Sequence, residues 1–268
     1  MDVTDGDAFE VGRRLERART AVRRERRRTA DELRALGDFE RHVRGVEAES
    51  PAVGPPAARA PVVAGDTDGL RAVREAYRET VMDVPHYEEE YADGYVESLT
   101  AEFSGDLAAA LTDGTRFNAR CKRALLDGIE AGRTARAGLL ELLVDERDSL
   151  SAAAETLVPL SAELSDLQHR AVGSAPHGML DAHRARLAVL DRKCETVAED
   201  RQAVLFEQRR TGGLPVEAPD IPVYVYQELP FDYPVMAAVA DCRRAIDRLR
   251  ETVDAAMAAS APDRERVE

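Results

Sequence analysis

The feature that most constrains the fold is an unbroken heptad pattern over residues 178–210. Side chains that suit a helix interface alternate there at steps of three and four: Leu180, His183, Leu187, Leu190, Cys194, Val197, Arg201 and Val204. This spacing puts them on one stripe of a helix, which is stable when a second helix covers it. The segment therefore predicts helix-on-helix packing.

Two other segments repeat the pattern. Residues 115–171 form the longest periodic run, and residues 233–258 form the last one. Only the short break "VGSAPHG" separates the first run from residues 178–210, and a short connection favours antiparallel neighbours. We predict an all-α fold: a long antiparallel coiled-coil hairpin over residues 115–210, with additional helices packed as a bundle at its base.

The rest of the chain divides by composition. Residues 1–49 read as an arginine-rich N-terminal helix, with Asp5 and Asp7 as candidate caps. Residues 50–66 are rich in Pro, Ala and Gly and are typical of a linker. Residues 67–268 are then expected to form a helical domain that contains the hairpin and the C-terminal helix 233–258.

One polar pair stands out within the hairpin. Folding the chain about the break sets Glu146 opposite Arg201, and each interrupts the apolar pattern of its own segment. Polar partners in a seam can specify helix alignment. We predict that Glu146 and Arg201 form a part-exposed register pair. The alternative is that both side chains extend outward to water.

An aromatic segment, "PDIPVYVYQELPFDYPV" at residues 219–235, precedes the last helix. It holds three of the seven tyrosines and one of the six phenylalanines. These four are Tyr224, Tyr226, Phe231 and Tyr233. Alternation and flanking prolines favour an extended crossing, whose rings cover the apolar base of the hairpin. The alternative is that the four rings form an exposed docking site for another protein.

The N-terminal helix contains the basic run "RRLERARTAVRRERRR". Its candidate nucleic-acid-binding residues are Arg13, Arg14, Arg17, Arg23, Arg24, Arg27 and Arg28. No aromatic residue interleaves with them to stack on bases. Residues 79–113 hold ten acids and neither Lys nor Arg, so this acidic stretch is the competing partner for the basic helix, within the chain or in another subunit.

Composition and motifs argue against several classes of function. The net charge is -14, and only two of the 37 basic residues are lysines, a balance typical of proteins from halophilic archaea. The cysteines, at positions 121, 194 and 242, fit neither a disulfide framework nor a zinc site. We expect no disulfide, no metal or cofactor site and no catalytic residues. No run approaches 18 apolar residues, so we expect a cytoplasmic protein without a membrane span.

Several segments carry a family resemblance, notably "YVESLTAEFSGDLAAAL", "RFNARCKRALL" and "YVYQELPFDYPVMAAVA". With these segments the chain resembles an uncharacterised haloarchaeal family, a domain of unknown function, whose most specific part is the block from Tyr226 to Pro234. The resemblance implies no activity. We therefore expect a non-enzymatic interaction or scaffold protein that binds another protein or itself through helices. The alternative is nucleic-acid association through residues 13–28.

Overall fold

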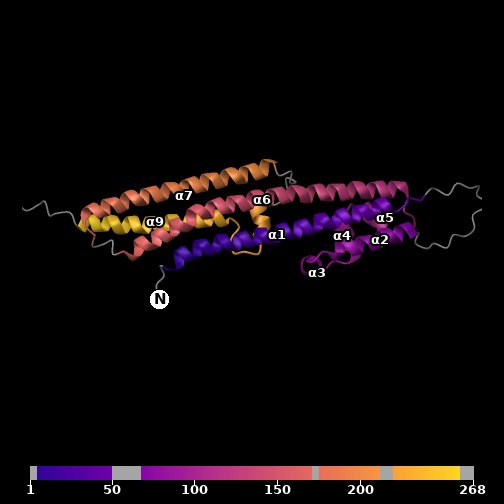
Figure 1. Ribbon diagram of the computed structural model, residues 1–268, viewed down its shortest axis with the longest axis horizontal. Helices are drawn as coiled ribbons and strands as arrows, with labels where there is room; N and C mark the ends of the chain where they lie inside the picture. The colour runs from indigo at the N-terminus through magenta and orange to yellow at the C-terminus, as the bar shows by residue number, and fades with distance from the viewer. Residues whose placement is uncertain (1–4, 50–67, 171–174, 212–219, 260–268) are drawn as a thin grey trace, which may run out of the picture. The chain divides into compact units, whose positions relative to one another are not determined.

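The computed structural model describes residues 5–49, 68–170, 175–211 and 220–259. Across these residues the chain folds into helices and has no strand, so the predicted all-α class is confirmed (Figure 1). The elements are α1 (Asp5–Gly45), α2 (Asp68–Thr80), the 3-10 helix η2 (Val81–Asp83), α3 (Tyr87–Glu90), α4 (Tyr95–Glu102), α5 (Gly105–Thr112), α6 (Ala119–His169), α7 (His177–Thr211), α8 (Ile221–Val225) and α9 (Pro234–Ala259).

The long helices lie where the sequence predicts them. The ends of α6, α7 and α9 fall within about one turn of the expected ends, and α1 stops at Gly45 rather than at residue 49. The predicted linker, residues 50–66, lies outside the described residues. None of the helices among the described residues is long and apolar enough to cross a membrane.

The chain forms two compact units whose limits fall inside α1 and α6 rather than at the predicted boundaries near residues 49 and 66. Unit 1 comprises Met1–Glu25 and Leu142–Glu268, and unit 2 comprises Arg26–Glu141. Each unit has its own hydrophobic core. The N-terminal helix therefore contributes to both cores instead of forming a domain of its own.

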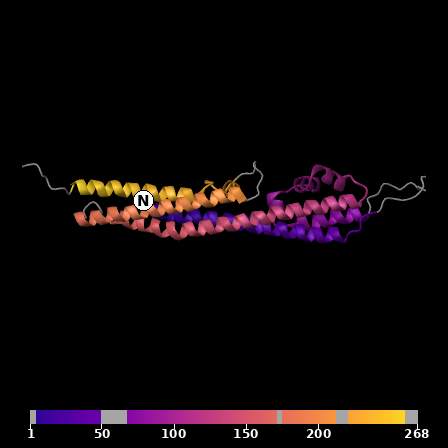
Figure 2. The same cartoon turned by 90° about the horizontal axis from the view of Figure 1, so that it is seen from above.

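The core of unit 1 collects the apolar stripes of four helical segments. They supply Val11, Leu15, Ala18 and Val22 from α1; Leu150, Leu157, Leu160 and Leu164 from α6; Leu187, Leu190, Cys194 and Val197 from α7; and Val235, Val239, Cys242, Ile246, Leu249 and Val253 from α9. In both views α9 runs alongside α7 (Figures 1 and 2). Burial of each large aliphatic side chain stabilises the folded state by about 1.5–3 kcal/mol. The heptad stripes are therefore the main source of stability in unit 1.

Unit 2 packs the short helices α2, α4 and α5 around an aromatic centre. The Tyr77 ring lies edge-on to Phe39 at 5.3 Å and to Tyr95 at 5.7 Å between centroids. Phe103 approaches α6 at Gly128, where an added Cβ would come within 3.0 Å of the ring. This glycine, unfavourable for an isolated helix, is therefore needed for close packing.

Candidate functional site

The structure brings Glu146 of α6 and Arg201 of α7 together in a bidentate ion pair. Two guanidinium nitrogens donate to the two carboxylate oxygens, each at 2.8 Å. Their side chains are 0% and 2% exposed. The expectation of a part-exposed pair is thus wrong, and so is the alternative in which both side chains reach water. Both side chains are therefore almost completely removed from solvent.

Two further donors complete the environment of Glu146. The Tyr226 hydroxyl donates to Oε1 at 2.5 Å, and Nε2 of Gln208 donates to Oε2 at 3.3 Å. Each carboxylate oxygen therefore accepts from two donors, which compensates for its removal from water. Burial, and then the negative charge of Glu146, raise the pKa of Tyr226, so the phenol stays protonated and keeps donating.

The backbone of the aromatic segment is not extended, contrary to the expectation from its alternating sequence. Residues Ile221–Val225 form the short helix α8, in which the amide of Tyr224 donates to the Asp220 carbonyl at 3.0 Å. Proline is well tolerated in the first turn of a helix, because its φ is already helical and its missing N–H has no partner to lose there. Pro222 therefore helps to start this helix.

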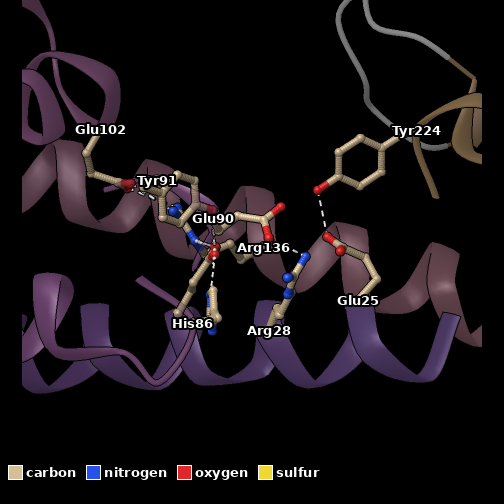
Figure 3. Close-up of polar contacts among 9 residues, drawn as sticks. Glu25, Arg28, His86, Glu90, Tyr91, Glu102, Arg136 and Tyr224 are labelled. Carbon is tan, nitrogen blue, oxygen red and sulfur yellow. Dashed lines mark hydrogen bonds and ion pairs between the residues drawn. The ribbon is translucent and has the colours of Figure 1, made fainter. Parts of the chain in front are cut away.

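The four aromatic side chains have different environments. Tyr226 is fully buried, whereas Tyr224 is exposed and donates to Glu25 at 2.6 Å (Figure 3). Phe231 is half-buried, and the guanidinium groups of Arg14 and Arg17 lie over its ring at 5.5 and 5.7 Å. Tyr233 is half-buried as well. Tyr226 thus covers the core as one hypothesis requires, and of the four only Tyr224 presents an exposed ring.

Most of the candidate nucleic-acid-binding arginines contact groups of the chain itself. In unit 1 the ion pairs are Arg13–Glu10 at 2.7 Å, Arg14–Asp241 at 2.9 Å, Arg23–Glu16 at 2.9 Å and Arg24–Glu228 at 2.8 Å. In unit 2, Arg28 pairs with Glu90, whereas Arg27 is exposed (Figure 3). The acidic stretch 79–113 therefore supplies Glu90 to the basic helix, while other acids neutralise the arginines of unit 1.

Unit 2 contains a second glutamate–arginine network, which no pattern in the sequence indicates. Arg136 donates from Nε to Glu32 at 2.9 Å and through both terminal nitrogens to Glu102 at 2.9 and 2.8 Å (Figure 3). The Tyr91 hydroxyl donates to Glu32 at 2.7 Å, and Nε2 of His86 lies 3.1 Å from the same oxygen. A carboxylate only accepts, so the imidazole is the donor.

These contacts control the charge of Glu32. Burial raises the pKa of this carboxyl, but the hydrogen bonds from His86, Tyr91 and Arg136 outweigh it and hold the pKa below its usual value. The network borders a cavity of about 210 Å³, whose other walls include Tyr77 and Tyr87. In the sequence His86 is followed closely by the acidic run Glu88–Glu90, yet its ring contacts the distant Glu32.

A groove of about 760 Å³ runs between α6 and α7 in unit 1. Its lining comes from residues 149–163 of α6 and 186–204 of α7. Small or short side chains, Ser149, Ala152, Ala153 and Thr156, form part of the α6 wall together with larger ones such as Pro159 and Leu160. Leu190, Val197 and Val204 contribute apolar surface from α7. Arg186 donates to Glu163 at 2.5 and 2.7 Å across one end of the groove.

All three cysteines are free thiols. Cys194 and Cys242 lie buried in the same core on α7 and α9, as their seam positions predict. Although 48 positions separate them along the sequence, the two cysteines belong to the same buried core cluster. Among the described residues there is no group of three or more His, Cys, Asp or Glu side chains arranged to hold a metal ion.

The fold and these sites define a helical protein with buried glutamate–arginine networks. The chain belongs to the family described as "Domain of unknown function (DUF7260)", whose model matches residues 13–250. The match includes the N-terminal arginine-rich helix, both hairpin helices and the aromatic segment. No curated protein and no solved structure matches the chain.

Proposed function

We propose that the protein is a non-enzymatic interaction module that receives a helix of another protein in the groove between α6 and α7. The single observation that carries this proposal is the groove itself, at about 760 Å³. Its α6 side, residues 149–163, extends over roughly 20 Å at 1.5 Å per residue. That length accommodates about four turns of a bound helix, the usual scale of helix-in-groove recognition.

The composition of the groove indicates which helix would fit. Ala152 and Thr156 are small, so a partner backbone can approach α6 closely, while Leu190 and Val197 offer apolar contacts. Glu155 borders the groove on α6, and Lys193 and Asp200 border it on α7. A helix with a narrow apolar stripe, a basic edge toward Glu155 and an edge of mixed charge toward α7 would match this lining.

Two alanine-to-arginine substitutions, one inside the groove and one outside it, test this proposal. Ala152→Arg fills the groove with a long charged side chain, whereas Ala255→Arg makes the same change at an exposed position of α9, outside the groove. Full-length protein carrying each change would be used to capture partners at a salt concentration close to that of the source cell. We expect Ala152→Arg to lose the captured helical partner and Ala255→Arg to keep it. Equal capture by both variants would rule out the groove.

The same experiment separates the other classes of partner. A second copy of the chain would appear as a dimer by light scattering of the purified protein, and this dimer would be lost with Ala152→Arg. Nucleic acid bound through residues 13–28 would be removed by nuclease. Its affinity would fall by roughly 10³ or more between low and moderate salt, and it would be insensitive to Ala152→Arg.

A further inference from the structure

We propose that the cavity of unit 2 binds a small organic cation, a primary ammonium group carried on a short apolar body. The cavity has a volume of about 210 Å³. Sites for drug-sized ligands occupy roughly 300–1,000 Å³, so the occupant is a smaller molecule. The cavity belongs to unit 2, whereas the groove between α6 and α7 belongs to unit 1. The two sites therefore stand or fall separately.

The cavity has a buried apolar interior and an exposed mouth. Leu36 and Tyr77 are each 1% exposed and Val84 is 8% exposed, so these side chains form its interior. Tyr91 is 45% exposed and Ala101 is exposed as well, which places them at the rim. A short hydrocarbon body can be covered by the interior while the ligand enters past the rim.

The charge of the lining favours a cation. Of the described residues that border the cavity, Glu32, Asp93 and Glu102 carry carboxylates, and Arg136 carries the one guanidinium. Arg136 is held between Glu32 and Glu102 (Figure 3). Three carboxylates against one guanidinium leave an excess of two negative charges, and the balance stays negative even with His86, beside Glu32, in its charged form. A cavity of one sign concentrates ligands of the opposite sign.

The lining has few hydrogen-bond donors left for a ligand. The hydroxyls of Tyr77, Tyr87 and Tyr91 are all engaged within the chain. Arg136 directs four hydrogen bonds to acceptors of the chain, and a guanidinium has five N–H groups. The tyrosines therefore meet a ligand mainly with their rings, whose faces attract cations. An anion or another acceptor would find little to bind.

Acceptors, by contrast, remain available. Within the described part of the chain, Oε2 of Glu32 and both carboxylate oxygens of Glu102 accept from Arg136 alone. The Asp93 carboxylate accepts from none of the described residues. Since each carboxylate oxygen can accept from two donors, and an ammonium group presents three N–H donors, a primary amine matches this lining.

Three ligands with the same hydrocarbon body test the proposal on the full-length protein. They are isobutylammonium, the neutral isobutanol and the anion isovalerate, each titrated and followed by saturation-transfer NMR. We expect saturable binding of isobutylammonium, about tenfold weaker binding of isobutanol because it forms no charge-assisted hydrogen bond, and none of isovalerate. The proposal is overturned if isovalerate binds as tightly as isobutylammonium, or if isobutylammonium shows no saturable binding.

A fourth ligand distinguishes a free amine from a lysine of a protein partner. Nα-acetyl-lysine amide carries the same ammonium group, but the donor-poor lining offers little to its amide carbonyls. We expect it to bind more weakly than isobutylammonium. Tighter binding of the lysine derivative would overturn the assignment to a free amine.

Substitutions then locate the binding. Ala101→Met places a longer side chain at the rim and should abolish binding of isobutylammonium. Ala109→Met, at an exposed position of α5 outside the cavity, is the control and should leave it unchanged. Asp93→Asn should weaken binding about two- to fivefold, whereas Asp113→Asn, exposed and outside the cavity, should not. Binding that survives Ala101→Met in protein with an unchanged circular dichroism spectrum overturns the site.

Discussion

The two glutamate–arginine networks use the same chemistry in different settings. Glu146 and Arg201 in unit 1 form a sealed pair, with both side chains at most 2% exposed, although Arg201 also lines the groove between α6 and α7. Glu32 and Arg136 in unit 2 border a cavity, with side-chain exposures of 17% and 21%. The first network joins two long helices at one level. The second connects α1 and α6 to the short segments around α3 and α4, within unit 2. Burial, rather than the type of pair, should decide how much each contributes.

The largest effect is expected from breaking the sealed pair on one side. Glu146→Leu leaves Arg201 buried without its counter-charge, which should reduce the free energy of unfolding by about 3–5 kcal/mol. Denaturant titration of unit 1, followed by the fluorescence of a probe placed there, measures the loss. The double variant Glu146→Leu/Arg201→Leu should recover most of it, because no uncompensated charge remains. A double variant as unstable as the single one would contradict this account.

A smaller loss of stability is expected in the Glu32–Arg136 network of unit 2, which borders a cavity. Arg136→Met removes three charge-assisted hydrogen bonds and leaves Glu32 and Glu102 without their shared cation. We expect a loss of about 2–3 kcal/mol, less than for Glu146→Leu, because water in the adjoining cavity can solvate the carboxylates. Arg71→Met, which breaks an exposed pair with Asp68, is the control and should change stability by less than about 0.5 kcal/mol. If Arg136→Met lowered the free energy of unfolding as much as Glu146→Leu, burial would not distinguish the two networks.

The next effect in size comes from Tyr226. Tyr226→Phe keeps the buried ring but deletes the hydroxyl that donates to Glu146, and it should lower the free energy of unfolding by about 1–2 kcal/mol. Tyr224→Phe removes a similar hydroxyl from an exposed ring that donates to Glu25. It should have little effect in the same denaturation assay. Equal effects would show that the burial of Tyr226 is energetically unimportant.

The smallest effect is a pH dependence in unit 2. The folded-state pKa of Glu32 is below its usual value of 4.5. Its stabilising contribution is therefore complete above the unfolded-state pKa and is lost as the pH falls through the folded-state pKa. Denaturation of wild type and Glu32→Gln should differ most above pH ~5 and converge on acidification. A difference that grows on acidification would reverse the assigned direction.

Regular periodicity explains why the sealed pair was predictable. Residues 178–210 keep heptad spacing without exception. Folding the chain at the short break before them was therefore enough to align them with α6 and to set Arg201 opposite Glu146. The degree of burial was missed because it depends on Tyr226 and Gln208, which no spacing rule assigns to that layer. The helix at Ile221–Val225 was missed as well, because a helix this short is stabilised by its tertiary contacts rather than by its own sequence.

The unit 2 network could not be predicted in this way. Glu32 and Arg136 lie 104 positions apart on different helices, and neither interrupts a recognisable apolar pattern. Their meeting depends on how the short helices α2 to α5 turn in space, which single-sequence patterns do not specify. His86 is a possible signal because it is one of only five histidines, but nothing in the residues around it indicates a contact with Glu32 of α1.

The central claim is that Glu146 and Arg201 specify the alignment of α6 with α7. Spin labels at the exposed positions 155 and 192 report this alignment through the distance between them, measured by pulsed electron–electron double resonance. The background is Cys121→Ser, in which the other two cysteines are buried. The account predicts one narrow distance distribution with the native pair. It predicts an added population in Glu146→Leu/Arg201→Leu, displaced along the axis by ~10 Å, one heptad. The same single distribution in both proteins would contradict it.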